Sequence, residues 1–110
     1  MRMWCVPPQL MCRQHLLGEH VELHIIVSHI VRGQKLDGFY AKGLIDTKLI
    51  KKRHADIVEE LSNRGWEHKS PLPEFTDPQK GFITDRSLDA LLERCSACRL
   101  LNRLSEEPLP

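Results

Sequence analysis

The chain has 110 residues, with 16 Lys and Arg against 15 Asp and Glu, and a formal net charge of +1. This length suits a single domain over residues 1–110, with one modest hydrophobic core. Its 41% apolar and 28% charged residues exclude an intrinsically disordered chain. No apolar run approaches the length of a membrane span. A net charge so close to zero excludes a uniformly basic surface, so any contact with DNA must come from a local patch.

The first residues of the chain and its four cysteines indicate the cellular compartment in which we expect the protein. The segment from Met1 to Val6, closed by Pro7 and Pro8, is too short for the apolar region of a secretory signal. Cysteines in a chain without an export signal are expected to be reduced thiols and not a disulfide framework. We therefore expect a cytoplasmic protein with no membrane partner.

Helical periodicity begins near the N-terminus. Pro8 is tolerated in the first turn of a helix, and Gly33 is a plausible stop, which predicts a helix between them. Its apolar stripe recurs at spacings of seven, four and three residues, through Leu16, Leu23, Val27 and Ile30.

Two further helices follow a turn-rich passage that contains Gly38 and Gly43. The second should start at Asp46 or Thr47 and end before Gly65, with a buried stripe of Ile50, Ile57 and Leu61. Residues 66–84 hold Pro71, Pro73, Pro78 and Gly81 and are expected to be irregular. A third helix, capped by Thr84 or Asp85, carries an apolar face of Leu88, Leu91, Leu92, Cys95 and Cys98 and continues to Leu101. The prediction is an all-α domain of three main helices and long irregular loops, without strands and with a frayed tail over residues 105–110.

Four chemically active side chains share one face of the first helix. Cys12, His15, Glu19 and Glu22 are three, four and three residues apart, on a face separate from the Leu16 stripe. Such a face is often only a solvated polar surface. It can also be the wall of a site.

A family resemblance is carried by several separated segments in a fixed order. The first helix reads Arg13-Gln14-His15-Leu16, followed by Glu19 and Glu22-Leu23. The chain opens Met1-Arg2-Met3-Trp4 and later contains Arg53-His54 and His68-Lys69-Ser70-Pro71-Leu72. These segments resemble the shorter phage and bacterial members of the pyrimidine dimer DNA glycosylases of the endonuclease V type. The resemblance extends from Met1 to about Arg99 and implies a three-helix fold, in agreement with the periodicity.

The resemblance implies a chemistry and its residues. In this family the N-terminal α-amine attacks C1′ of the damaged nucleotide, the base leaves, a Schiff base forms, and β-elimination cuts the strand, without a cofactor. The motif maps the essential glutamate onto Glu22 and the first-helix histidine onto His15. Arg2 is bulky enough to block removal of the initiator residue, so Met1 should carry the amine. α-Amines titrate about two pH units below lysine side chains, which makes them the better imine-forming nucleophiles at neutral pH.

The resemblance also implies duplex DNA with damaged bases as the partner of a monomeric protein. The candidate DNA contacts are Arg2, Arg13, Gln14, Lys51, Lys52, Arg53, His54 and His68, with Arg94 and Arg99 as further cations. Two arginines of the family are replaced by Val21 and Ile25, and its aromatic, basic C-terminal tail is absent. We therefore expect the contacts that recognise a pyrimidine dimer to differ more from those of the family than the chemistry of the amine does.

A CxxC motif, Cys95-Ser96-Ala97-Cys98, lies in the predicted third helix. Tetrahedral zinc needs four ligands, which Cys12 and His15 could complete if the first and third helices pack side by side. Because both cysteines fall on an apolar stripe and the resemblance gives His15 another role, buried free thiols are the favoured interpretation, without a metal.

Several residues keep two interpretations. His54 is either a core histidine or part of the active-site wall, and His68 either contacts DNA or caps a turn. Trp4 and Trp66 are interpreted as core anchors. The leading function is a DNA repair glycosylase and abasic-site lyase. The alternatives are a non-catalytic DNA- or nucleotide-binding module with the same fold, and a zinc-stabilised interaction domain.

Overall fold

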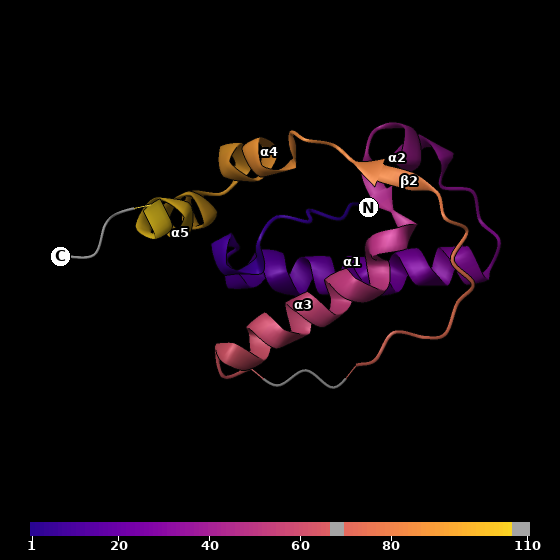
Figure 1. Cartoon of the computed structure of the whole chain (residues 1–110), viewed down its shortest axis with the longest axis horizontal. Coiled ribbons are helices and arrows are strands. Elements are labelled where there is room, and N and C mark those ends of the chain that lie inside the picture. The colour runs from indigo at the N-terminus through magenta and orange to yellow at the C-terminus, as the bar shows by residue number, and fades with distance from the viewer. Residues whose placement is uncertain (67–69, 107–110) are drawn as a thin grey trace.

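The computed structural model describes residues 1–66 and 70–106 and is dominated by helices (Figure 1). In chain order the elements are η1 (Pro8–Leu10), α1 (Arg13–Val31), α2 (Asp37–Ala41), β1 (Leu44–Asp46), η2 (Thr47–Leu49), α3 (Ile50–Asn63), β2 (Gly81–Ile83), α4 (Ser87–Arg94) and α5 (Ser96–Glu106). The prediction of a mainly α-helical protein is confirmed. None of the helices in these described ranges combines the length and the apolar character that a bilayer crossing needs.

The core forms where α1 and α3 pack against each other (Figure 1). From α1, Leu16, Leu23 and Val27 are fully buried, as the stripe predicted, while Ile30 is only partly buried. From α3, the predicted stripe of Ile50, Ile57 and Leu61 is fully buried. The Asp46 carboxylate accepts a hydrogen bond from the Lys48 backbone N–H at 3.0 Å and so caps η2, the short helix that leads into α3; α3 itself starts at Ile50, later than the predicted cap at Asp46 or Thr47.

The N-terminal segment runs as extended chain through the middle of the fold. The Met3 N–H donates to the Leu44 carbonyl oxygen at 2.7 Å, and the Ser87 hydroxyl donates to the Trp4 carbonyl oxygen. Met3 and Trp4 are buried, which confirms Trp4 as a core anchor. Residues close to the N-terminus are therefore held between α1, β1 and α4.

The prediction of a fold without strands is wrong in one place. β1 pairs antiparallel with β2, with Leu44 opposite Ile83 and Asp46 opposite Gly81. Three-residue strands are too short to show an alternating pattern, and these two lie far apart in the sequence. Gly81 has φ of +88°, and a Cβ there would run into the Ile45 carbonyl oxygen, so this position requires glycine.

The helix boundaries also differ from the predicted ones. Pro8 opens the short η1 helix, and α1 starts only at Arg13. The turn-rich passage contains α2, which a five-residue helix does not reveal by periodicity. The predicted third helix is two helices, because Cys95 adopts an extended conformation (φ −130°, ψ 112°) between α4 and α5. The helix continues through Ser105 to Glu106, and residues 107–110 of the predicted frayed tail lie outside the described residues.

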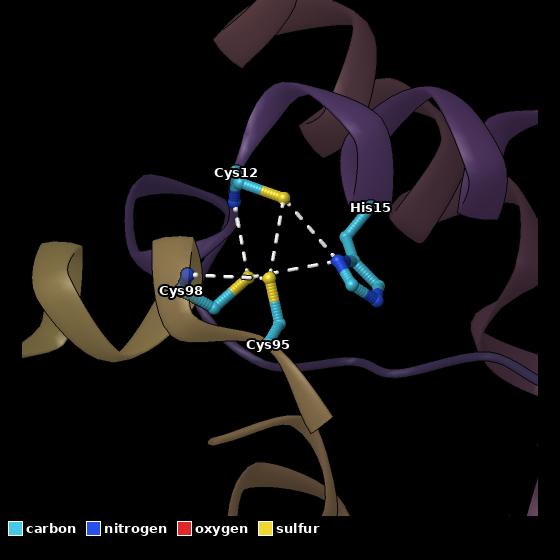
Figure 2. Close-up of side chains that lie close together, drawn as sticks. All are labelled: Cys12, His15, Cys95 and Cys98. Carbon is cyan, nitrogen blue, oxygen red and sulfur yellow. Dashed lines mark hydrogen bonds between the residues drawn. The ribbon is translucent and has the colours of Figure 1, made fainter. Parts of the chain in front are cut away.

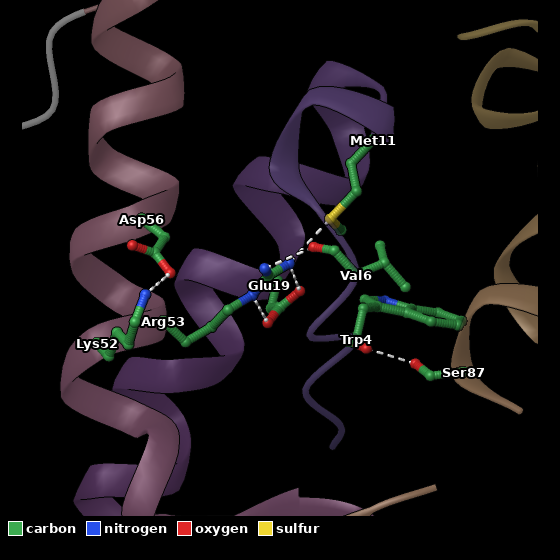
Figure 3. Close-up of polar contacts among 8 residues, drawn as sticks. All are labelled: Trp4, Val6, Met11, Glu19, Lys52, Arg53, Asp56 and Ser87. Carbon is green, nitrogen blue, oxygen red and sulfur yellow. Dashed lines mark hydrogen bonds and ion pairs between the residues drawn. The ribbon is translucent and has the colours of Figure 1, made fainter. Parts of the chain in front are cut away.

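A buried ion pair joins α3 to α1 and to the N-terminal segment (Figure 3). The Arg53 guanidinium donates to both Glu19 carboxylate oxygens, at 2.7 and 2.9 Å. It also donates to the Val6 carbonyl oxygen at 2.6 Å and lies 3.0 Å from the Met11 sulfur. Arg53 and Glu19 are 6% and 1% exposed, so their mutual attraction acts in a poorly screened interior.

We expect Arg53→Met to lower the free energy of unfolding by about 3–5 kcal/mol, because it leaves the Glu19 carboxylate buried without its partner. Lys52→Met is the matched control, because Lys52 forms only an exposed pair with Asp56 at 2.9 Å. That control should cost less than about 0.5 kcal/mol. Urea unfolding measures both. Equal losses in the two variants would contradict the structural role of Arg53, and Glu19→Leu added to Arg53→Met should recover part of the loss.

Candidate active site

A pocket of about 440 Å³ opens between the N-terminal segment and the first turns of α1. Its size lies in the range of small-molecule and nucleotide sites. Its lining comes from the N-terminus, α1, α2, β1 and α4, and consists of Met1, Arg2, Trp4, Gln14, His15, Gly18, Glu19, Glu22, Phe39, Leu44 and Arg94. The three residues to which the sequence assigned catalysis, Met1, His15 and Glu22, thus lie around one cavity.

The two carboxylates in this wall are in different states. Glu19 is 1% exposed and accepts a hydrogen bond from Arg53 on each carboxylate oxygen, so its charge is committed to this buried pair. Glu22, three residues further along α1, is only partly buried as a residue. Its Oε2 atom is nevertheless shielded from solvent and has no hydrogen-bond partner among the described residues. A shielded carboxylate oxygen without a protein partner is uncommon in folded proteins, and it leaves an acceptor for a water, a ligand or a proton in this pocket.

Two arginines make the pocket electropositive. The Arg2 guanidinium lies 3.7 Å from the centre of the Trp4 ring, and that of Arg94 lies 5.6 Å from it. Burial lowers the pKa of Arg2, the nearby positive charge of Arg94 lowers it further, and Glu19 acts in the opposite direction. Arg2 is thus half-buried beside a second cation. Such a site favours an anion, and the phosphates of DNA are anions of the right kind.

His15 connects the pocket to a cluster of cysteines (Figure 2). Its Nδ1 atom lies 3.2 Å from the Cys12 sulfur and 3.7 Å from the Cys98 sulfur. Cys12 is the residue that precedes α1, Cys95 separates α4 from α5, and Cys98 is in the first turn of α5. The four side chains from opposite ends of the sequence could hold a metal ion, since their ligand atoms all lie within 4.8 Å of one another.

The thiols of the cluster differ in their electrostatic environment. Burial raises the pKa of Cys98 to about 12. Burial also acts to raise the pKa of Cys95, but hydrogen bonds from Cys98 and Cys12 outweigh it, so this pKa lies below that of an ordinary thiol. Of the two CxxC cysteines predicted to be buried, Cys98 is buried, whereas Cys95 is only half-buried because the helix breaks there and leaves the apolar stripe. Cys12 is also half-buried.

A second group of histidines lies across the contact between α1 and α3. His20, His24 and His54 place their ring nitrogens within 4.8 Å of one another. His54 Nε2 lies 3.2 Å from the Ser70 carbonyl oxygen, and His54 does not line the pocket of Met1 and Glu22. Beside this group, Val21 and Ile25 are 55% and 38% exposed, so the two positions where the resemblance implies arginines carry exposed apolar side chains.

The structure separates the predicted DNA contacts into several groups. Arg2 and Gln14 line the pocket, and Arg13 is exposed, with its guanidinium 4.8 Å from the Trp66 ring centre. Lys51 is exposed above Phe75, 5.3 Å from the ring centre, on a different part of the surface. His68 lies outside the described residues.

Two residues of the run Lys51-Lys52-Arg53 already bind carboxylates of the protein itself. Lys52 donates to Asp56 at 2.9 Å, and Arg53 is buried against Glu19. A buried guanidinium with all these contacts cannot reach a phosphate, so Arg53 does not belong to a DNA surface. Arg53 lies on the buried side of α3, one turn before Ile57. Its spacing from the apolar stripe is the feature of the sequence that could have predicted its burial.

Sequence reasoning missed the pocket residues that come from other elements. Phe39 and Leu44 carry no chemical signal, and Arg94 was only one of several possible cations. They meet Met1 and Glu22 because α2, β1 and α4 fold back around the N-terminal segment.

Comparison with known proteins identifies the family. Residues 1–74 match the family described as pyrimidine dimer DNA glycosylase. No curated protein and no solved structure matches the chain. Because the match covers more than half of the chain, this protein belongs to the pyrimidine dimer DNA glycosylase family. The family acts on DNA in repair, and the matched residues include Met1, His15 and Glu22 but not Arg94, Cys95 or Cys98.

We expect Arg94→Ala to weaken DNA binding and to reduce the slope of log affinity against log salt by about 0.9, the value for one lost phosphate contact on duplex DNA. Arg32→Ala is the matched control, since Arg32 lies past the far end of α1, roughly 25 Å along the helix axis from His15. Fluorescence anisotropy with duplex DNA over a salt series measures both slopes. A wild-type slope in Arg94→Ala would remove Arg94 from the contact surface.

Proposed function

We propose that this protein is a pyrimidine dimer DNA glycosylase with abasic-site lyase activity, and that its nucleophile is the α-amine of Met1. The observation that carries the proposal is that Met1 and Glu22, whose Oε2 atom has no hydrogen-bond partner among the described residues, line one electropositive pocket. The family match supports the substrate class and includes both residues.

The reaction proceeds in four steps on the damaged nucleotide. The neutral Met1 amine donates its electron pair to C1′, and the bond between C1′ and the base breaks, with its electrons leaving on the base. The C1′–O4′ bond then opens, O4′ takes a proton, and an imine forms between Met1 and C1′. Loss of a C2′ proton expels the 3′ phosphate by β-elimination, which cuts the strand. Water finally hydrolyses the imine and frees the amine.

Glu22 serves this sequence as a carboxylate beside the sugar. It stabilises the positive charge that develops at C1′ and can then carry a proton between the amine, O4′ and C2′. Its shielded oxygen strengthens both effects, because electrostatic interactions are less screened away from water. Glu19 cannot replace it while Arg53 occupies both of its oxygens.

The neighbouring residues hold the DNA. Arg2 and Arg94 lie beside the pocket and can bind the phosphates that flank the lesion, while Gln14 and the exposed Arg13 extend this surface along α1. His15 presents its ring to the same cavity. Enzymes that reach C1′ extrude a nucleotide from the duplex stack, and the pocket volume of about 440 Å³ can hold part of an extruded nucleotide.

Borohydride reduction distinguishes this enzyme from a non-catalytic DNA-binding module. We expect sodium borohydride to fix the protein covalently to abasic duplex DNA, because reduction of a protein–DNA imine leaves a stable amine bond, whereas reduction of the free sugar aldehyde joins nothing. Mass spectrometry of the adduct should place the link on the nitrogen of Met1. A short N-terminal peptide extension should abolish trapping, because it moves the free amine away from Glu22, whereas the same extension at the C-terminus should not. Binding without trapping would favour the non-catalytic module.

We expect Glu22→Gln to reduce excision of a pyrimidine dimer by at least about a hundredfold, the scale of a lost acid–base group, while the fold is kept. Glu59→Gln, an exposed carboxylate on α3, is the matched control and should excise at the wild-type rate. Single-turnover cleavage of a defined-lesion duplex gives the rates, and circular dichroism checks the fold. Wild-type excision by Glu22→Gln would refute the assignment. Glu19→Gln should instead lower stability, since it weakens the buried pair with Arg53.

A further inference from the structure

We propose that Cys12, His15, Cys95 and Cys98 form a structural zinc site that joins the N-terminus of α1 to the junction of α4 and α5 (Figure 2). Three thiolates and one imidazole are a ligand set that zinc uses in closed structural sites. The cluster was not favoured as a metal site on sequence grounds, because a single CxxC motif is a weak signal. The folded chain supplies the two missing ligands.

The distances within the cluster fit one tetrahedral ion. Bonds of about 2.3 Å to sulfur and about 2.0–2.1 Å to nitrogen place two sulfur ligands about 3.8 Å apart, and a sulfur and a nitrogen about 3.6 Å apart. The Cys12 and Cys95 sulfurs are 3.8 Å apart. His15 Nδ1 lies 3.2 Å from the Cys12 sulfur and 3.7 Å from the Cys98 sulfur. The remaining ligand-atom distances are within 4.8 Å, so small side-chain rotations complete the tetrahedron.

The backbone around the cluster supports thiolates. The Cys12 N–H donates to the Cys98 sulfur at 3.2 Å, and the Cys98 N–H donates to the Cys95 sulfur at 3.4 Å. Backbone donors aimed at sulfur stabilise its negative charge, and such outer contacts orient metal ligands. Cys95 has an extended conformation between α4 and α5, and its sulfur lies 3.8 Å from the Cys12 sulfur. All four cysteines of the chain are free.

The geometry selects among possible occupants. A disulfide would need the sulfurs about 2.05 Å apart, and the two half-buried cysteines are held well beyond that distance. Magnesium and calcium prefer oxygen ligands, and none of the four ligands supplies one. An iron–sulfur cluster spreads its ligands around several iron and sulfide ions, whereas these four ligand atoms converge on the space of one ion. Zinc fits the remaining conditions.

The site has two consequences for the molecule. It ties Cys95 and Cys98, which lie beyond the residues matched by the family, to the start of α1, so it adds a cross-link between the two ends of the chain. It also fixes the ring of His15. With Nδ1 bound to zinc, the other ring nitrogen, which points away from the sulfurs in Figure 2, carries the proton and faces outward from the cluster.

The first test uses the wild-type full chain. Protein purified from zinc-supplemented cultures, without a metal-binding tag, should contain one zinc ion per chain by elemental analysis, released as a thiol-modifying mercurial is added. Removal of zinc should lower the Tm by roughly 5–15 °C, because a structural metal contributes directly to the free energy of folding. Cobalt added to the apo protein should give the visible bands of tetrahedral coordination and near-ultraviolet thiolate charge-transfer bands. Four titratable thiols in a chain that takes up neither metal would overturn the proposal.

Variants then locate the metal. Cys95→Ser combined with Cys98→Ser should lose zinc and the thiolate bands, whereas Cys5→Ser should keep both. Cys5 is the matched control because it is the remaining cysteine, and burial and the Glu19 charge raise its pKa to about 12. His24→Ala separates this site from the group of His20, His24 and His54, and should leave the thiolate bands unchanged. Unaltered cobalt bands in the double cysteine variant would overturn the assignment. Because zinc content and cobalt spectra do not depend on DNA cleavage, they remain informative if the glycosylase activity is absent.

Discussion

The Arg53 guanidinium holds three separate parts of the chain in register. It binds Glu19 of α1 through two hydrogen bonds and the Val6 carbonyl oxygen through a third, while its own backbone belongs to α3. A buried charge is costly unless it is paired and its donors are satisfied, and these contacts meet that condition. The α1–α3 contact and the path of the N-terminal segment are therefore coupled. If either moved, the guanidinium would lose a partner that water could not replace.

Because of this coupling, two carboxylates on α1 have different roles. Glu19 is buried and forms the ion pair with Arg53. Glu22, less than one turn away, has a shielded oxygen without a hydrogen-bond partner in the described structure. The same ion pair holds Val6, so the chain from Val6 back to Met1 is directed over the face of α1 that carries Glu22. In the proposed mechanism, the ion pair of Glu19 thus helps to position the Met1 amine near the Glu22 carboxylate.

The C-terminal helices lie outside the residues that match the family, yet they contribute to both sites. α4 contributes Arg94 to the pocket, and the break at Cys95 brings two thiols to Cys12 and His15. His15 belongs to both groups, because its Nδ1 atom faces the sulfurs while its ring lines the cavity. A zinc ion there would connect the stability of the C-terminal helices to the geometry of the pocket wall. Val21 and Ile25, at the positions where the resemblance implies arginines, lie beside the histidine group and do not line the pocket of Met1 and Glu22.

The sequence determined the helical class, the buried stripes of α1 and α3, and the family, because periodicity and short motifs are local properties. The spacing of His15, Glu19 and Glu22 placed them on one helix face, and the motif singled out Glu22. Tertiary structure alone decided that Arg53 is a core residue, that Arg94 joins the pocket, and that α4 and α5 are separate helices. It also decided the pairing of β1 with β2 and the meeting of Cys12 with Cys95. These features depend on contacts between residues far apart in the chain, and such contacts leave no periodic signal in the sequence of either partner.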